Sequence, residues 1–273
     1  MKVFISADME GTTGVTGWDD VTSGKPPYER FRRLLTGDVN AAIEGAFEAG
    51  ATEVLVNEAH SGMRNILLEE LDQRATMISG FKGKRLAMME GIDESFDAAF
   101  LVAYHARAGT DAAILNHTFL LSVHNFWING VLVGETGLSA SLAGHHGVPI
   151  ALVTGDDKVS AEAKVLLGPV ETAVVKKGIS RYAANCVTPE QSGLAIKEAA
   201  KKALGLKAKP YRPEGPAKMT VEFTSPDLAA AASMVPGIVR EDSRTISCEA
   251  KDVLSAWNVV FPSMMLATTA EER

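Results

Sequence analysis

The chain has 273 residues, of which 46% are hydrophobic, so it is long and apolar enough for one large domain or two smaller ones. Its formal net charge is 27 − 34 = −7. This mildly acidic balance, together with the lack of a Lys/Arg-rich tract, argues against nucleic acid as a partner.

Apolar runs that predict strands alternate with segments of helical periodicity. Residues 2–7 predict a strand, and residues 28–49 predict a helix because apolar residues recur there at three- and four-residue steps until Gly50. Asn129-Gly130 between apolar pairs predicts a hairpin over 126–134. The pattern also predicts strands over 53–58, 97–105, 117–123 and 148–157, and helices over 135–146 and 157–167.

This alternation predicts an α/β fold with a mostly parallel sheet covered by helices. The segment 207–218 holds three prolines and predicts a linker. After it, 219–225 and 244–250 resemble strands, and a last helix begins near residue 251. We therefore expect an α/β catalytic domain over residues 1–206 and a linker with a smaller C-terminal α+β part over 207–273.

Two cysteines, Cys186 and Cys248, are too few for a disulfide framework, and we expect both to be buried small apolar residues, with a single bridge as the alternative. The segment MKVFISAD lacks the apolar core of a signal peptide, and no apolar run of about 18 residues predicts a membrane helix. These features predict a cytoplasmic protein without a membrane partner.

Polar side chains collect where the predicted strands end. In an open α/β sheet, ligands bind at the carboxyl ends of the strands. At or just beyond these ends the chain places the following residues: Asp8, Glu10, Asn57, Glu58, His60, His105, Glu135, Asp156 and Asp157. Independent strands thus deliver histidines and carboxylates to one edge of the sheet.

Histidine and carboxylate ligands without thiolates suit zinc, manganese or cobalt. Asp8 and Glu10 are two residues apart on an extended chain, so both can face the same side. A carboxylate can bridge two metal ions about 3.5–4 Å apart, and the ions would neutralise charges that are costly to bury alone. Gly11 and Gly14 leave the backbone room to turn close to the ions.

Each of these residues also has an ordinary structural interpretation. Asp8 and Glu10 can be strand-end residues, His60 a loop histidine, and His105 a core histidine. Glu135 can be a first-turn glutamate favoured by the helix dipole, and one of Asp156 and Asp157 a helix cap. The convergence of the whole set at one edge favours a metal site over five separate coincidences.

His117 differs because it lies at the start of a predicted strand. A neutral histidine there can shuttle protons or orient a reacting group, and a hydrogen-bonded structural histidine is the alternative. Nucleotide-binding glycine motifs and a GxSxG elbow are both absent from the sequence.

Several blocks together resemble the bacterial D-aminopeptidases, the dipeptide-transport-operon type of zinc peptidase. They run in order from residue 1 to about 200: SADMEGTTG, VLVNEAHSGMRN, FLVAYHARAGT, NHTF, INGVLVGETGL, VTGDD and KKGISRYAA. The last third of the chain matches only loosely.

The resemblance implies a site with two zinc ions per chain, held by Asp8, Glu10, His60, His105 and Glu135. It implies that His117 is the catalytic histidine and that the chain assembles as a homodecamer. The implied reaction is removal of N-terminal D-amino acids, such as D-Ala, from short peptides. There are two alternatives. The first is another binuclear-metal hydrolase, either an amidase or a phosphoesterase, for which Arg64, Lys82 and Arg107 are the candidate phosphate-binding residues. The second is a non-catalytic peptide-binding protein with structural zinc.

Overall fold

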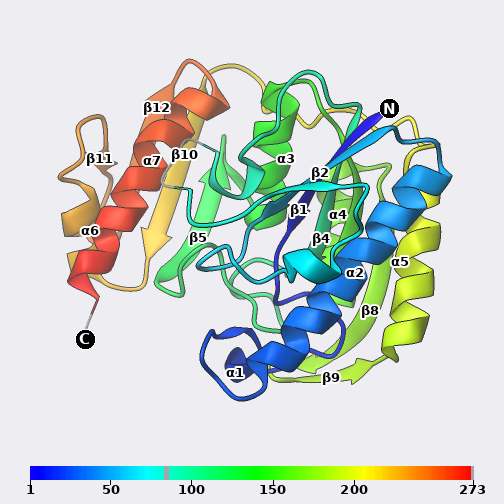
Figure 1. Cartoon of the computed structure of the whole chain (residues 1–273). Helices are drawn as coiled ribbons and strands as arrows, with labels where there is room; N and C mark the ends of the chain where they lie inside the picture. Colours follow the sequence, from blue (N-terminus) through cyan, green and yellow to red (C-terminus); the bar gives the residue numbers. More distant parts are fainter. Residues whose placement is uncertain (83–85, 272–273) are drawn as a thin grey trace.

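The computed structural model describes residues 1–82 and 86–271, and it contains two sheets (Figure 1). The larger has seven strands in the order β3-β2-β1-β4-β7-β8-β9, parallel except for the β8–β9 pair. Its strands are β1 (Lys2–Ala7), β2 (Glu53–Glu58), β3 (Thr76–Ile78), β4 (Ala98–Tyr104), β7 (Ile150–Asp156), β8 (Glu171–Ser180) and β9 (Ala183–Cys186). The predicted α/β fold with a mostly parallel sheet is confirmed.

Helices cover both faces of this sheet, which explains why its central strands are apolar on both sides. In β1, Val3 and Ile5 pack in one core with helices α2 (Tyr28–Glu48) and α5 (Pro189–Ala203). Between them, Phe4 points to the opposite core, which contains helices α3 (Glu135–His145) and α4 (Asp157–Leu167). Both faces are therefore closed, and the open part of the sheet is its carboxyl edge.

The second sheet is antiparallel, in the order β11-β12-β10-β5-β6. Its strands are β5 (Val123–Ile128), β6 (Val131–Leu132), β10 (Ala217–Phe223), β11 (Val239–Arg240) and β12 (Thr245–Ala250). The predicted hairpin joins β5 to β6 through Asn129 and Gly130, whose φ angles are 49° and 79°. Because β5 pairs with β10, this sheet takes strands from both sides of residue 206, and the domain division at that residue stays a prediction.

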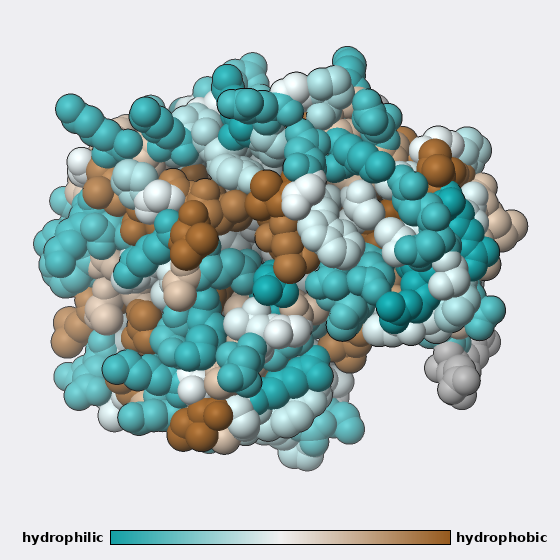
Figure 2. Space-filling view, turned by 180° about the vertical axis from the view of Figure 1, so that it is seen from behind, coloured by the Kyte–Doolittle hydropathy of each residue, from teal (hydrophilic) through white to brown (hydrophobic). Residues whose placement is uncertain are grey.

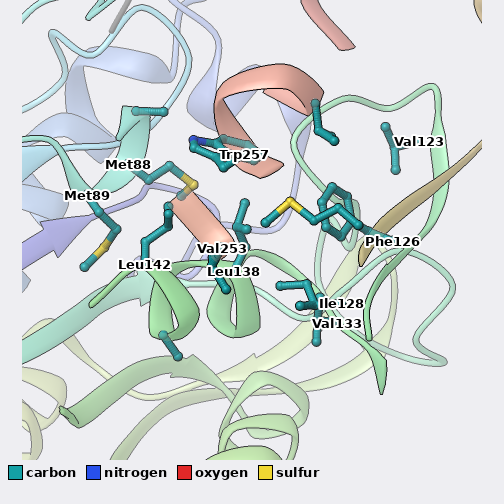
Figure 3. Close-up of a cluster of buried hydrophobic side chains, with 14 of the residues drawn as sticks. Met88, Met89, Val123, Phe126, Ile128, Val133, Leu138, Leu142, Val253 and Trp257 are labelled. Atoms are coloured by element: carbon teal, nitrogen blue, oxygen red, sulfur yellow. The ribbon is translucent and has the colours of Figure 1, made fainter. Parts of the chain in front are cut away.

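Helix α7 (Val253–Ala267) packs against the second sheet and against α3. Figure 3 shows Val253 and Trp257 beside Leu138 and Leu142 of α3. By length and composition alone, the window Val253–Ala270 is also apolar enough to cross a membrane. Core helices have the same composition, and the burial of Trp257 assigns α7 to the core.

The remaining helical segments are short: α1 (Trp18–Val21), α6 (Pro226–Ala232), and the 3₁₀ turns η1 (Leu68–Glu70), η2 (Ala87–Met89) and η3 (Thr268–Ala270). Of these, α1 and η2 lie beside the carboxyl edge of the large sheet, because residues of both line the same cavity there.

Two expectations are wrong. The predicted strand over 117–123 is a turn with one isolated bridge between Thr118 and Leu120, because Phe119 adopts a positive φ of 61° that an extended strand does not allow. Cys186 is exposed on the edge strand β9 rather than buried, while Cys248 is buried as expected, and neither forms a disulfide.

Candidate metal centre

The segment after β1 continues along β4 and carries the first two carboxylates. The amide of Asp8 donates to the carbonyl oxygen of Val102 at 2.9 Å, and the amide of Gly11 donates to that of Ala103 at 2.8 Å. A Cβ on Gly11 would overlap the Tyr104 carbonyl oxygen, so this approach requires glycine. Asp8 and Glu10 are thereby held, almost fully buried, at the carboxyl edge.

The Asp8 carboxylate lies between two imidazoles. Its Oδ1 is 3.4 Å from Nδ1 of His60, which follows β2, and its Oδ2 is 3.5 Å from Nε2 of His105, which follows β4. Oε2 of Glu10 lies 3.0 Å from the same Nδ1 of His60. Two oxygens of one carboxylate thus face two separate groups of candidate ligands.

Glu135 and His117 complete the cluster from the other side. Oε1 of Glu135, in the first turn of α3, lies 3.4 Å from Nε2 of His105 and accepts a hydrogen bond from the Phe119 amide at 2.7 Å. The ring of His117 stacks on that of His105 with centroids 4.1 Å apart, and its Nε2 is 3.7 Å from Oε1 of Glu135. The structure therefore brings all six predicted side chains together.

Backbone carbonyls orient the three histidines. His60 Nε2 donates to Val21 O, His105 Nδ1 to Ala106 O, and His117 Nδ1 to Leu115 O, each at 2.9 Å. In a neutral imidazole this leaves a lone pair on the opposite nitrogen, and all three lone pairs point into the cluster. Such outer hydrogen bonds are how proteins fix the tautomer of metal-binding histidines.

The donor atoms fit a metal. Oδ2 of Asp8, Oε2 of Glu10 and Nε2 of His105 are buried without a hydrogen-bond donor. Ligand atoms of Asp8, Glu10 and His105 lie within 4.8 Å of one another, and so do those of His105, His117 and Glu135. Carboxylate and imidazole lone pairs that face each other in a buried site need a cation between them, and this donor set suits zinc.

In the metal-free protein, bound protons offset part of the repulsion between these buried carboxylates. Burial and the Glu10 carboxylate raise the pKa of Asp8 to about 7. Burial alone would lower the pKa of His60 and His105, but the facing carboxylates raise it well above its usual value. For His117, burial and the nearby His105 lower the pKa, which favours the neutral imidazole.

Backbone strain is concentrated around the same site. Within residues 1–82 and 86–271, eight non-glycine residues have a positive φ. Five of them flank the three histidines: Ser61, Met63, Ala103, Leu115 and Phe119. A sixth, Ala87, lines the adjoining cavity. Residues held in such conformations cost about 1–3 kcal/mol each and cluster at functional sites.

Five side chains of the cluster line a cavity of about 600 Å³, and His105 lies behind them without lining it. Its walls are mainly apolar and come from distant segments: Trp18 and Val21 of α1, Met63, Phe81, Met88, Phe119, Leu120, Leu121, and Phe261 and Met265 of α7. Glu271 lies at the rim. This volume is within the range of about 300–1,000 Å³ typical of small-ligand sites.

Other polar residues of the predicted edge have structural roles. Asn57 donates to the Met88 carbonyl oxygen at 2.6 Å, and Glu58 accepts from the Ile66 amide and from Ser79. Asp156 caps α4, as expected for one of the pair, and Asp157 accepts from the Gly178 amide. None of these four residues lines the cavity.

Sequence reasoning missed two features of the site. The α7 wall was not anticipated, because Phe261 and Met265 lie more than a hundred residues beyond the last predicted ligand. Lys176, buried in β8, was also missed, although a lysine within the apolar run of that strand is an unusual signal.

Known proteins are similar to this chain over nearly its whole length. A D-aminopeptidase family model matches residues 1–261. A D-aminopeptidase of Bacillus subtilis strain 168 is 39% identical over 272 residues, covering 98% of both chains. The solved zinc-dependent D-aminopeptidase DppA from Bacillus subtilis, described as a self-compartmentalizing protease, has a TM-score of 0.95 over 98% of both chains at 39% identity. By its sequence and its fold, the chain belongs to the D-aminopeptidase family.

Proposed function

We propose that the protein is a zinc-dependent aminopeptidase that removes N-terminal D-amino acids, such as D-Ala, from short peptides. The observation that carries this proposal is the position of Asp8, whose two carboxylate oxygens face His60 and His105. This arrangement supports two zinc ions per chain, which Asp8, Glu10, His60, His105 and Glu135 would hold. The relatives' activity supports the choice of peptide substrates and of the D configuration.

Zinc in this site would supply positive charge that polarises a peptide carbonyl and lowers the pKa of a water molecule. The chain itself supplies orientation and proton transfer. The free amine of a peptide would sit against a metal or against one of the carboxylates of Asp8, Glu10 and Glu135, which favours an exopeptidase. The apolar walls exclude water and contact uncharged side chains.

His117 is the candidate catalytic residue. Its Nδ1 donates to the Leu115 carbonyl oxygen, so a neutral ring presents a lone pair at Nε2 toward Glu10 and Glu135. A lone pair accepts a proton or attacks a carbon, but it does not donate a hydrogen bond to an oxyanion. The tautomer therefore favours a nucleophile or a general base over an oxyanion stabiliser.

The cavity distinguishes this proposal from a phosphoesterase. Phosphate binding normally uses Arg or Lys. Among the described residues that line the cavity, none is a lysine or an arginine. Lys82 instead donates to the Glu58 carbonyl oxygen, and Arg107 donates to that of Ala108 at 2.9 Å. The surroundings thus favour the acyl group of a peptide over a phosphate ester.

Assembly is part of the proposal. Figure 2 shows apolar side chains in a broken band across the upper half of one face, and the β8–β9 hairpin exposes Ile179 and Tyr182 at 69% and 55%. Exposed apolar surface of this kind often marks contacts between subunits. Together with the self-compartmentalizing relative, it supports a homo-oligomer, and we propose a decamer. A cytoplasmic location stays a prediction.

The test combines metal analysis with a substrate panel. We expect the purified protein to contain two zinc ions per chain and to hydrolyse D-Ala-D-Ala faster than L-Ala-L-Ala, with no turnover of p-nitrophenyl phosphate. Chelation should abolish hydrolysis and added zinc should restore it. Preference for the phosphoester, or full activity without metal, would contradict the proposal. Tightly bound zinc without any peptide hydrolysis would instead favour a structural metal site.

A further inference from the structure

Lys176 is a lysine buried in the middle of β8, with 1% of its surface exposed. Its ammonium group donates three hydrogen bonds, to the carbonyl oxygens of Glu10 at 2.6 Å, Thr12 at 2.8 Å and Val15 at 2.9 Å. An ammonium has three N–H donors, so all of them are used. Every acceptor belongs to the segment Asp8–Val15, which we call the ligand segment because it carries Asp8 and Glu10.

This burial is costly for the fold. Among the described residues, no carboxylate oxygen lies within 4.0 Å of the Lys176 ammonium. Burial lowers its pKa to about 8, although Asp156 and Asp38 oppose the shift. The loss of hydration of a buried ammonium offsets much of what its hydrogen bonds contribute, so Lys176 adds little net stability to the fold. Global stability is therefore a poor reason for a lysine at this position.

The local geometry offers a better reason. The hydrogen-bond donors of the ligand segment have other partners. The Gly11 amide donates to the Ala103 carbonyl oxygen, and the Thr13 amide and hydroxyl donate to the Asp38 carboxylate at 2.9 Å. Lys176 holds three carbonyl oxygens of the same segment, including that of Glu10 itself. Fixing the Glu10 peptide plane restricts the direction of its side chain, which faces His60 at 3.0 Å.

We propose that Lys176 is a positioning residue of the metal centre, which gathers the ligand segment from β8 so that Asp8 and Glu10 face the histidines before metal binds. This inference rests on the proposed metal site. It assigns Lys176 no contact with the substrate or with the reacting atoms.

The test compares Lys176→Met with Lys177→Met. Lys177 is the next residue of β8, is exposed, and undergoes the same chemical change away from the ligand segment. Zinc is titrated calorimetrically into chelator-treated protein, and the melting temperature is measured without metal. We expect Lys176→Met to bind zinc at least tenfold more weakly, about 1.4 kcal/mol, while its metal-free melting temperature stays unchanged or rises. Lys177→Met should match the wild type in both.

Wild-type zinc affinity in Lys176→Met would overturn the inference while leaving the proposed function intact. A loss of affinity matched by an equal loss of metal-free stability would also overturn it, since that is the mark of a general structural role. Absence of zinc binding by the wild type would overturn the inference and the proposed function together. If Lys176→Met does not fold, Lys176→Gln, which keeps two N–H donors without the charge, is measured against the same outcomes.

Discussion

His117 stands apart from the other two histidines of the metal centre because its nearest carboxylate oxygens are 3.7 and 3.9 Å away. Its ring stacks on that of His105, with ring centroids 4.1 Å apart, and makes an edge contact with the ring of Trp18, with centroids 5.5 Å apart. It is close enough to the cluster to act on a bound peptide, and close enough to Glu135 and His105 to serve as a ligand. Only a measurement of metal content separates these two roles.

We expect His117→Ala to keep both zinc ions and to lose about 10²–10⁴-fold in kcat, the usual contribution of a positioned acid–base group. The control is His124→Ala, which removes an exposed histidine of β5 and should change neither quantity. Metal analysis and steady-state kinetics on D-Ala-D-Ala check both variants. Loss of one zinc ion would make His117 a ligand, and full turnover would remove it from the mechanism.

Asp38 gives the ligand segment a pH-dependent support. Its carboxylate accepts hydrogen bonds from the Thr13 amide and hydroxyl, and burial raises its pKa to about 6. Between pH 4 and 6 the folded protein keeps a proton that the unfolded chain has lost, so this contribution to the free energy of unfolding falls as pH rises. This contribution is fully present below about pH 4 and lost above about pH 6.

Asp38→Asn cannot titrate and should lack this slope. We expect the wild type to lose at most about 3 kcal/mol relative to the variant between pH 4 and 6. Urea unfolding of both chelator-treated proteins at several pH values measures the difference. Parallel pH profiles would show that Asp38 has an ordinary pKa.

At the scale of elements, the rule that ligands collect at the carboxyl ends of parallel strands anticipated most of the site. Asp8, His60 and His105 each follow a strand of the large sheet and meet there. The turn around His117 was not predictable, because a sequence does not show that Phe119 adopts a positive φ. Lys176 was not predictable either, since its partners lie more than 160 residues away.

Helix α7 packs against the second sheet and also reaches the cavity. Phe261 lines the cavity, and its ring centroid lies 5.0 Å from that of Trp257. The ring centroid of Trp257 lies in turn 5.2 Å from that of Phe119. This aromatic row connects the C-terminal helix to the turn that presents His117. The C-terminal part of the chain therefore contributes directly to the cavity beside the candidate metal centre.

We expect Phe261→Ala to lower kcat/KM about tenfold for dipeptides with a bulky apolar residue, because deleting a buried apolar contact costs roughly 1–3 kcal/mol. Hydrolysis of D-Ala-Gly should change little. Kinetics with D-Ala-D-Phe and D-Ala-Gly give the comparison, and Val259→Ala, on the same helix outside the cavity, is the control. Equal losses for both substrates would mean that Phe261 supports the fold and not the substrate.

For the whole molecule, the candidate metal centre brings together side chains that lie far apart in the sequence. The candidate ligands lie between residues 8 and 135. Asp8 and Glu10 follow β1, His60 follows β2, His105 follows β4, and Glu135 begins α3. Metal that binds the folded state alone raises the free energy of unfolding, by about 2.7 kcal/mol at a concentration one hundred times its dissociation constant. Without metal, three buried carboxylates repel one another instead.

Asp8→Asn should therefore change stability in opposite directions with and without zinc. In chelator at pH 8, the variant should melt at or above the wild-type temperature, because one of the three buried charges is gone and the fold is otherwise unchanged. With zinc, the wild type should melt several degrees higher, because only its Asp8 carboxylate faces both His60 and His105. Thermal unfolding under the two conditions tests this, with Asp19→Asn, which changes an exposed carboxylate, as the control. A variant that is less stable by the same amount in both conditions would mean that Asp8 stabilises the fold through its hydrogen bonds and not through metal.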